Sequence, residues 1–218
     1  MKIAIDGPAG AGKSTVAKLL AGRLGAHYLD TGAMYRAMAY ALMEREIDVK
    51  DVPAVLAALE GIDISIRYDD QGQRVLAGGR DVTDYIRTPA VSRGASDVAV
   101  IPEVRLKLVK TQRETAEVYD IVMDGRDIGT YVLPDADAKF FVTASSRERA
   151  IRRQKDLAAA GIDTPLDALE AEIIARDETD SNREFAPLRA AEDALVIDTT
   201  QMSVEQVLEA MLRRIQEG

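Results

Sequence analysis

Short apolar runs alternate with segments of helical periodicity along most of this chain. Each run resembles a β-strand and ends in a small or acidic residue. The predicted strands are Lys2–Asp6, His27–Asp30, Tyr119–Asp124, Lys139–Thr143 and Leu195–Asp198. Strands separated by helices usually form a parallel sheet covered on both faces. The pattern therefore predicts an α/β fold, in which ligands bind beyond the carboxyl ends of the strands.

One interruption of this alternation predicts a small antiparallel insertion. Ile62–Tyr68 alternates apolar and polar residues, and a polar turn, Asp69–Gly72, follows it. Gln73–Ala77 and Arg80–Val82 then have the pattern of further short strands. We expect the insertion to occupy about residues 61–85.

A second interruption, Ser146–Pro165, is a charged helical segment broken at Gly161. Its arginines are Arg147, Arg149, Arg152 and Arg153. We interpret the segment as a mobile lid.

The most specific motif is Gly7–Thr15, a Gly, four residues and then Gly-Lys-Ser, directly after the first predicted strand. Its glycines permit a loop whose N–H groups turn toward an anion. Lys13 adds positive charge for the β- and γ-phosphates, and Ser14 offers a hydroxyl to Mg²⁺. We expect ATP to contact Gly7, Pro8, Ala9, Gly10, Ala11, Gly12, Lys13, Ser14 and Thr15.

The context of this loop favours a nucleoside-triphosphate site over a chance match. The helical spacing of Val16, Leu19, Leu20 and Leu24 predicts a helix after the loop, and a helix N-terminus favours negative charge. The Gly-x-Gly-x-x-Gly spacing of a dinucleotide-binding turn does not occur here.

Composition narrows the classes of protein. The 218 residues are 47% hydrophobic and 30% charged, as in ordinary globular domains. The absence of cysteine excludes disulfides, thiolate catalysis and Cys-ligated zinc. A formal charge of −9 makes a nucleic-acid polymer a poor partner. No apolar run approaches the roughly 20 residues of a membrane span, and the phosphate loop follows Met1 too closely for a cleavable signal. We therefore expect a cytoplasmic protein.

Two strand ends carry candidate residues for a second anion. Thr31 is placed to cap the helix that follows the second strand, and Arg36 lies about one turn into that helix. Asp124 ends the third strand, where a carboxylate can hold Mg²⁺ through water, and Arg126 can bind a phosphate bidentately. A capped helix with a surface arginine and a polar turn with a local ion pair are the structural alternatives.

A helix predicted to begin near Leu166 has one face, a continuous stripe, that is apolar for two turns and then becomes charged. At 3.6-residue spacing the stripe comprises Leu166, Leu169, Ile173, Arg176, Asp180 and Arg183. Because its apolar start faces the core, its charged end is expected to line a cleft. The alternative is a solvated helix end with a weak Arg–Asp pair.

The chain has few candidate bases. Its one histidine, His27, is expected to be a surface or loop residue, so a general base would have to be a carboxylate. A phosphate acceptor is already anionic and requires positive charge rather than a base. This favours transfer from ATP to a phosphate over transfer to an alcohol.

Two rival functions stay open. One is a small-metabolite kinase that phosphorylates an alcohol with Asp127 as base. The other is a nucleotide-dependent regulatory switch. Against the switch, the only asparagine is Asn182, so the guanine-reading Asn-Lys-x-Asp element is absent.

Taken together, these motifs resemble those of the bacterial cytidylate kinases, within the nucleoside-monophosphate kinases. The resemblance covers essentially the whole chain. It rests on Gly7–Thr15, Leu29–Arg36, Asp124–Gly129, Arg149–Arg153 and Arg176–Leu188. It implies a P-loop kinase core with a five-stranded parallel sheet flanked by helices, a small antiparallel β insertion in the monophosphate-binding region, and a helical lid. The implied parts are a core of residues 1–30, 100–145 and 166–218, a monophosphate-binding region of residues 31–99, and a lid of residues 146–165.

The same resemblance implies ATP with Mg²⁺ as donor and CMP or dCMP as acceptor. We also expect a monomer with no nucleic-acid or membrane partner. The implied CMP contacts are Thr31, Arg36, Ser96, Arg105, Arg126, Asp127, Arg176, Asp180 and Arg183. The implied catalytic residues are Lys13, Arg126, Asp127, Arg149, Arg153 and Arg183. Ser14 would bind Mg²⁺, with Asp124 acting through water. Ser96 and Arg105 rest mostly on the resemblance, since the pattern alone places them on helix surfaces flanking Pro102. Thr31 stands where many members have serine, and it keeps the hydroxyl.

Overall fold

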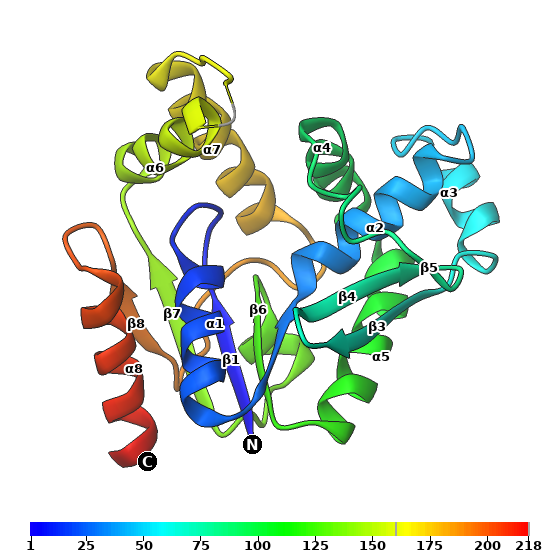
Figure 1. The fold of residues 1–218 in the computed structure, drawn as a ribbon. Coiled ribbons are helices and arrows are strands. Elements are labelled where there is room, and N and C mark those ends of the chain that lie inside the picture. Colours follow the sequence, from blue (N-terminus) through cyan, green and yellow to red (C-terminus); the bar gives the residue numbers. More distant parts are fainter. Residues whose placement is uncertain (160, 218) are drawn as a thin grey trace. The chain divides into compact units, whose positions relative to one another are not determined.

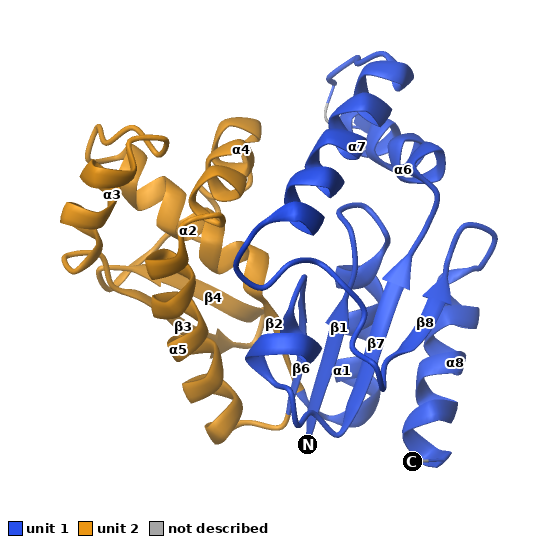
Figure 2. Cartoon of the chain, turned by 180° about the vertical axis from the view of Figure 1, so that it is seen from behind, with its two compact units in different colours: residues 1–26, 121–218 blue, residues 27–120 orange. Residues whose placement is uncertain are grey.

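The computed structural model describes residues 1–159 and 161–217 and divides into two compact units (Figure 1). Unit 1 comprises residues 1–26 and 121–218, and unit 2 comprises residues 27–120 (Figure 2). The sequence had suggested residues 27–30 and 100–120 as part of the core, whereas their contacts group them with unit 2.

A parallel sheet of five strands confirms the predicted α/β class. Its order is β2-β6-β1-β7-β8. The strands are β1 (Lys2–Asp6), β2 (His27–Asp30), β6 (Ile121–Gly125), β7 (Ala138–Thr143) and β8 (Leu195–Asp198). The third predicted strand begins at Ile121 rather than at Tyr119 because the Tyr119 N–H closes the preceding helix on Thr115 O.

The central strand of unit 1, β1, leads directly into the phosphate loop. Ile5 is aligned with Asp124 of β6 on one side and with Phe140 of β7 on the other. Ile3, Ala4 and Ile5 are completely buried. Helix α1 (Lys13–Leu24) contacts β6 and α8 (Val204–Glu217), while α8 contacts β7. The start of the loop is therefore fixed by a buried strand that pairs with a neighbour on each side.

The remaining elements of unit 1 are a π-helical turn, η1 (Ile128–Val132), and the helices α6 (Ser146–Ala159) and α7 (Leu166–Asn182). Helices α6 and α7 pack on each other around a small core of their own. This core contains Ala150, Leu169 and Ile173, with Leu157 and Leu166 packed against it. The predicted helix break at Gly161 is confirmed, because its φ of +76° lies in the left-handed region.

Unit 2 combines helices with the predicted antiparallel insertion. The helices are α2 (Thr31–Met43), α3 (Val52–Leu59), α4 (Pro89–Val98) and α5 (Pro102–Val118). The insertion is the sheet β3 (Ile64–Asp69), β4 (Gly72–Ala77) and β5 (Arg80–Asp81), in that order. Helix α2 contacts α4, α5 and this sheet, and the buried side chains include Met34, Met38, Leu42, Ile64 and Leu108.

Over residues 1–159 and 161–217, no helix combines the length and the apolar character needed to cross a membrane.

Candidate active site

The phosphate loop (Gly7–Thr15) adopts a conformation that requires its glycines. Gly7, Gly10 and Gly12 have φ values of +144°, +76° and +89°. A Cβ on Gly7 would overlap the carbonyl oxygen of Val142. A Cβ on Gly10 would lie 3.3 Å from Cβ of Arg149. The loop is thus packed tightly against β7 and α6, and no larger side chain fits at Gly7.

Lys13 begins α1 and is 5% exposed. Its Nζ donates a hydrogen bond to the carbonyl of Pro8 over 2.8 Å. Burial, followed by the like charge of Arg126, lowers the pKa of Lys13 to about 7. The buried ammonium therefore favours a compensating anion, as an ATP phosphate would be.

The Ser14 hydroxyl donates to Oδ2 of Asp124 over 2.8 Å, and Asp124 is 5% exposed at the end of β6. Both side chains provide hard oxygen atoms, the donor type that Mg²⁺ prefers. Within the described ranges, no three carboxylate, histidine or cysteine side chains gather as a metal site. Ser14 and Asp124 therefore suit an ion such as Mg²⁺, most of whose ligands are phosphate and water oxygens.

A cavity of about 420 Å³ lies against the loop within unit 1. Lys13 and Ser14 line it from the loop, and Arg152 and Arg153 line it from α6. Arg176 lines it from α7. Positive side chains from three separate segments therefore face one space beside the loop, as a polyphosphate ligand requires.

Arg149, predicted to act from the lid, is 5% exposed and binds internal partners. Its Nε donates to the carbonyl of Ala144 over 3.0 Å, and its Nη1 donates to the carbonyl of Ala9, also over 3.0 Å. Its guanidinium also forms an ion pair with Asp177 of α7. In this structure Arg149 of α6 links the phosphate loop to α7.

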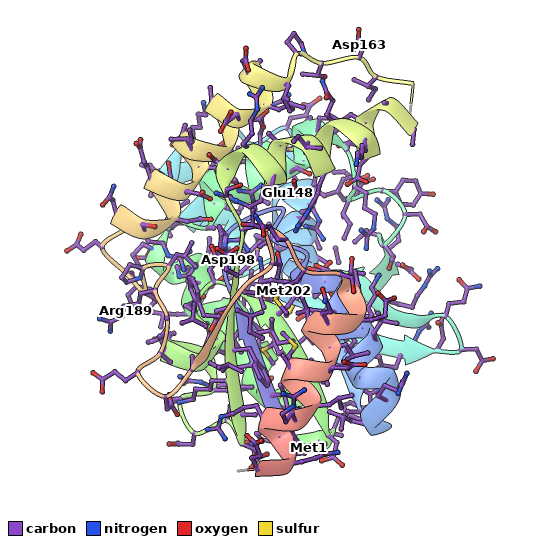
Figure 3. All side chains as sticks on the ribbon, turned by 90° about the vertical axis from the view of Figure 1, so that its left-hand side faces the viewer. Met1, Glu148, Asp163, Arg189, Asp198 and Met202 are labelled. Carbon is purple, nitrogen blue, oxygen red and sulfur yellow. The ribbon has the colours of Figure 1, made fainter. Side chains whose placement is uncertain are left out.

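Arg152 is a site residue that the sequence interpretation did not select. Its Nη2 donates to the carbonyl of Thr199 over 2.8 Å, and its Nε donates to Glu148 over 3.0 Å. Thr199 follows β8 and donates its hydroxyl to the carbonyl of Ala11. Figure 3 labels Glu148 on α6 and Asp198 at the end of β8, the two elements that Arg152 connects. The i, i+4 spacing of Glu148 and Arg152 was the only sequence signal for this arrangement.

Two arginine–carboxylate pairs follow the end of β6. Nε of Arg126 donates to Oδ2 of Asp180 over 2.8 Å. Burial raises the pKa of the Asp180 carboxyl, but the charge and the hydrogen bond of Arg126, together with the charges of Arg176 and Arg183, outweigh burial and hold this pKa below its usual value. Nη2 of Arg183 lies 3.4 Å from Oδ1 of Asp127, and both side chains are at most 6% exposed.

These pairs decide between the two interpretations of the α7 stripe. Leu169, Ile173 and Asp180 are buried, Arg176 is half-buried, and Arg183 directly follows the helix. The charged end of the stripe therefore stays on the buried side, as a cleft-lining face does. A solvated helix end would leave these side chains exposed.

Unit 2 holds Thr31 and Arg36 at the end of β2. The prediction that Thr31 caps α2 is wrong: the cap is Asp30, whose Oδ1 accepts from the Ala33 N–H over 2.8 Å. Asp30 has extended backbone angles, while Thr31 is already helical and buried. Oδ2 of Asp30 also accepts from Nη2 of Arg36 over 2.8 Å. Nε of Arg36 is buried and makes no hydrogen bond within the described residues.

Arg105, expected on a helix surface, is instead 1% exposed. Its Nη1 donates to the carbonyl of Ala99 over 3.2 Å, and its guanidinium carbon lies 5.5 Å from the centre of the Tyr35 ring. The surface expectation is wrong because α5 packs its Arg105 face against α2. Ser96 of α4 is half-buried, and its hydroxyl donates to the carbonyl of Ser92.

His27 is half-buried rather than exposed, because the Tyr68 and Tyr119 rings lie 4.3 and 4.5 Å from its ring, centre to centre. These contacts indicate that His27 packs against aromatic side chains of unit 2.

The predicted site residues therefore fall into two groups. Unit 1 contains Lys13, Ser14, Asp124, Arg126, Asp127, Arg149, Arg153, Arg176, Asp180 and Arg183. Unit 2 contains Thr31, Arg36, Ser96 and Arg105.

Known proteins with this chain's fold include kinases. The structure of a gluconokinase from Sinorhizobium meliloti matches with a TM-score of 0.51 at 12% identity, covering 99% of this chain and 91% of that one. An uncharacterized protein from Eubacterium ventriosum matches with a TM-score of 0.55 at 13% identity, covering 100% and 99%. At these identities the similarity concerns the fold alone.

Sequence similarity is much more specific. The chain is 48% identical over 215 residues to a cytidylate kinase from Carboxydothermus hydrogenoformans, covering 99% of this chain and 97% of that one. It is 50% identical over 218 residues to a cytidylate kinase from Exiguobacterium sibiricum, covering 100% and 97%. The family model described as cytidylate kinase matches residues 3–217. The chain that builds this site therefore belongs to the cytidylate kinase family.

Proposed function

We propose that this chain transfers the γ-phosphate of ATP to CMP and dCMP, giving ADP and CDP or dCDP. The observation that carries the proposal is that unit 1 contains both a phosphate loop and arginine–carboxylate pairs. The loop has a buried lysine, Lys13, and the two pairs are Arg126–Asp180 and Arg183–Asp127. Membership of the cytidylate kinase family supports it.

The donor side of the reaction rests on the phosphate loop. Its glycines allow backbone N–H groups to orient the donor phosphates, and Lys13 neutralises the charge that develops during transfer. The Nζ of Lys13 exchanges its Pro8 carbonyl partner for a phosphate oxygen when ATP binds. This exchange replaces a neutral acceptor with a charged one and so strengthens the contact.

Mg²⁺ fits the oxygen donors of this site, with Ser14 as a ligand and Asp124 acting through water. When bound, the ion neutralises and orients the β- and γ-phosphates of the donor.

The acceptor side rests on the arginines. Arg36, Arg126 and Arg183 hold the monophosphate, with Arg176 and Asp180 meeting its phosphate or ribose side. Thr31, Ser96, Arg105 and Asp127, together with Arg126, contact the cytosine and the phosphate of CMP. The buried Nε of Arg36 supports this assignment, because a polar atom in that position is stabilised by a ligand that accepts its hydrogen bond.

The lid, residues 146–165, excludes water from the transferring phosphate, because an open site would hydrolyse ATP. Arg153 lines the cavity beside the loop and is the lid arginine assigned to the transferring group. Arg149 contributes to catalysis from its position between Ala9 and Asp177.

The test is a coupled assay of ADP release with an acceptor panel of CMP, dCMP, UMP, dUMP, AMP, GMP and shikimate. We expect turnover with CMP and dCMP far above turnover with the purine nucleotides and the alcohol. Preferred phosphorylation of the alcohol would replace the proposal with a small-metabolite kinase that uses Asp127 as base. Slow ATP hydrolysis that no acceptor stimulates would indicate a regulatory switch.

We further propose that the chain acts as a monomer in the cytoplasm, with small nucleotides as its partners. Sedimentation equilibrium at several concentrations tests the oligomeric state directly.

A further inference from the structure

Asp6 is the last residue of β1 and directly precedes Gly7 of the phosphate loop. Its side chain is buried, with the residue 3% exposed. Oδ1 accepts the N–H of Ile128 and Oδ2 accepts the N–H of Gly129, both over 2.7 Å. A single carboxylate of the central strand therefore binds two successive backbone amides of the turn that follows β6.

These two amides begin the π-helical turn η1. The first N–H groups of a helical turn have no partner inside the turn, and an Asp at the N-cap usually accepts one of them. Asp127 occupies the N-cap of η1, yet within residues 127–132 its side chain makes no capping hydrogen bond. Asp6 provides the cap instead, from a different strand.

Gly129 is shaped to this contact. A Cβ at this position would lie 3.1 and 3.3 Å from the side-chain carbons Cδ and Cγ of Lys139, and 3.4 Å from Oδ2 of Asp6. The glycine therefore lets the amide approach the carboxylate while the Lys139 side chain covers the turn. Such a close approach would otherwise require the side chain of Lys139 to shift.

The consequence concerns Asp127. Because Asp6 caps η1, the carboxylate of Asp127 can point toward Arg183, whose Nη2 lies 3.4 Å from Oδ1. We propose that Asp6 is a positioning residue for the reaction: by capping η1 it orients Asp127 toward Arg183 and the acceptor nucleotide. The inference rests on the proposed function, in which Asp127 and Arg183 contact CMP.

The ionisation of Asp6 sets the conditions for the test. Burial raises the pKa of Asp6 to about 7, although the hydrogen bonds from the amides of Gly129 and Ile128 lower it. Of the nearby charges, that of Asp127 raises this pKa and that of Lys13 lowers it. The cap needs both oxygens as acceptors, which is the ionised form. All variants are therefore measured at pH 8, where the ionised form of Asp6 predominates in the wild type.

The first experiment compares Asp6→Asn with the wild-type enzyme in steady-state kinetics and in binding of a non-hydrolysable ATP analogue. The amide of Asn offers one acceptor oxygen and turns its NH₂ group toward the other backbone N–H, so one of the two capping hydrogen bonds is lost. We expect KM for CMP to rise about tenfold, the effect of losing one charged hydrogen bond, while the ATP-analogue affinity changes less than threefold.

A matched control lies at the other end of the same strand. Oδ2 of Asp137 accepts the N–H of Lys2 over 2.6 Å at the exposed end of β1. Asp137→Asn neutralises a carboxylate that likewise accepts a backbone N–H but lies away from the site, and we expect it to leave KM for CMP unchanged. An equal effect of both variants, or an equal loss of ATP-analogue and CMP affinity in Asp6→Asn, would assign Asp6 a structural role and overturn the proposal.

A double-mutant cycle tests whether Asp6 acts through Asp127. If it does, Asp6→Asn changes KM for CMP by less than twofold when Asp127 is already replaced by Asn. A full tenfold effect in that background contradicts the proposal. Amide hydrogen exchange gives a readout independent of activity: Ile128 and Gly129 exchange slowly in the wild type, and at least one of them exchanges rapidly in Asp6→Asn.

The exchange measurement also separates the two proposals. A wild-type enzyme that does not phosphorylate CMP refutes the proposed function, whatever the exchange rates are. Unaltered protection of both amides in Asp6→Asn refutes the capping role of Asp6, whatever the substrate is.

Discussion

The hydroxyl of Ser14 donates to the carboxylate of Asp124 over 2.8 Å and thereby joins the phosphate loop to the end of β6. The two residues lie 110 positions apart in the chain, and the parallel pairing of β1 with β6 brings them together. A hydroxyl and a carboxylate so close together supply the oxygen donors that a hard cation prefers, which supports the proposed Mg²⁺ site.

Asp124→Asn is expected to raise the Mg²⁺ concentration for half-maximal activity by about tenfold, because a neutral amide binds a hydrated cation more weakly. A Mg²⁺ titration at saturating ATP measures this shift. Asp135→Asn is the control, since Asp135 is exposed. An unchanged midpoint in Asp124→Asn would remove this residue from the metal site.

Arg183→Ala is expected to reduce kcat/KM for CMP by about a hundredfold or more, through the loss of a buried guanidinium that we propose binds the acceptor phosphate. Steady-state kinetics with varied CMP provide the measurement. Arg189, an exposed arginine a few residues farther along the same loop, gives the matched control Arg189→Ala, which should retain normal kinetics. Similar kinetics for the two variants would contradict the assignment of Arg183.

Gly7→Ala is expected to abolish ATP binding, because its Cβ would overlap the carbonyl oxygen of Val142 and displace the loop. Isothermal calorimetry with ATP and thermal unfolding test this. The control is Gly22→Ala in α1, where the added Cβ would have no atom within 4 Å other than those of its chain neighbours and its own helix backbone. Alanine there should stabilise the helix by about 0.5–1 kcal/mol. Normal ATP affinity in Gly7→Ala would show that the loop can relax around a methyl group.

The Arg126–Asp180 pair predicts a specific dependence of stability on pH. Because the pKa of Asp180 is lower in the folded than in the unfolded chain, its stabilisation is fully present above the unfolded value of about 4. It is lost as the pH falls through the folded value. Urea unfolding between pH 6 and pH 3 should therefore show a smaller loss of stability in Asp180→Asn than in the wild type.

At pH 6 the same variant should be less stable than the wild type by about 3 kcal/mol, since it leaves the Arg126 charge without its partner. Asp167→Asn on the same helix serves as control, because the Asp167 side chain is 91% exposed and its ion pair with Arg147 is solvated. Parallel pH profiles for the wild type and Asp180→Asn would contradict the prediction.

The parts of this molecule that the sequence predicted are those with local causes. The phosphate loop follows from its glycines and from a buried strand before it, and the five strands follow from short apolar runs. The stripe on α7 is also a local pattern, because one helix face carries both Leu169 and Asp180. Such features depend on residues that are close in the chain.

The features that the sequence did not predict depend on tertiary partners. A charged side chain such as that of Arg105 is usually exposed, and only the packing of α5 on α2 buries it beside Tyr35. The cap of α2 belongs to Asp30 because the helix begins at Thr31, a boundary that propensity alone does not locate. The role of Asp6 depends on amides more than 120 positions away.

Helices α6 and α7 enclose their own apolar side chains, Ala150, Leu169 and Ile173. Closure of the proposed lid, residues 146–165, would keep these side chains out of water if α7 moved together with α6, and it would then leave the hydrophobic free energy of the pair unchanged. Such a movement would instead alter polar bonds, such as those of Arg152 to Thr199, which water can replace at little net cost. The closed and open arrangements would then differ by a few hydrogen bonds, a balance that a bound phosphate is strong enough to reverse.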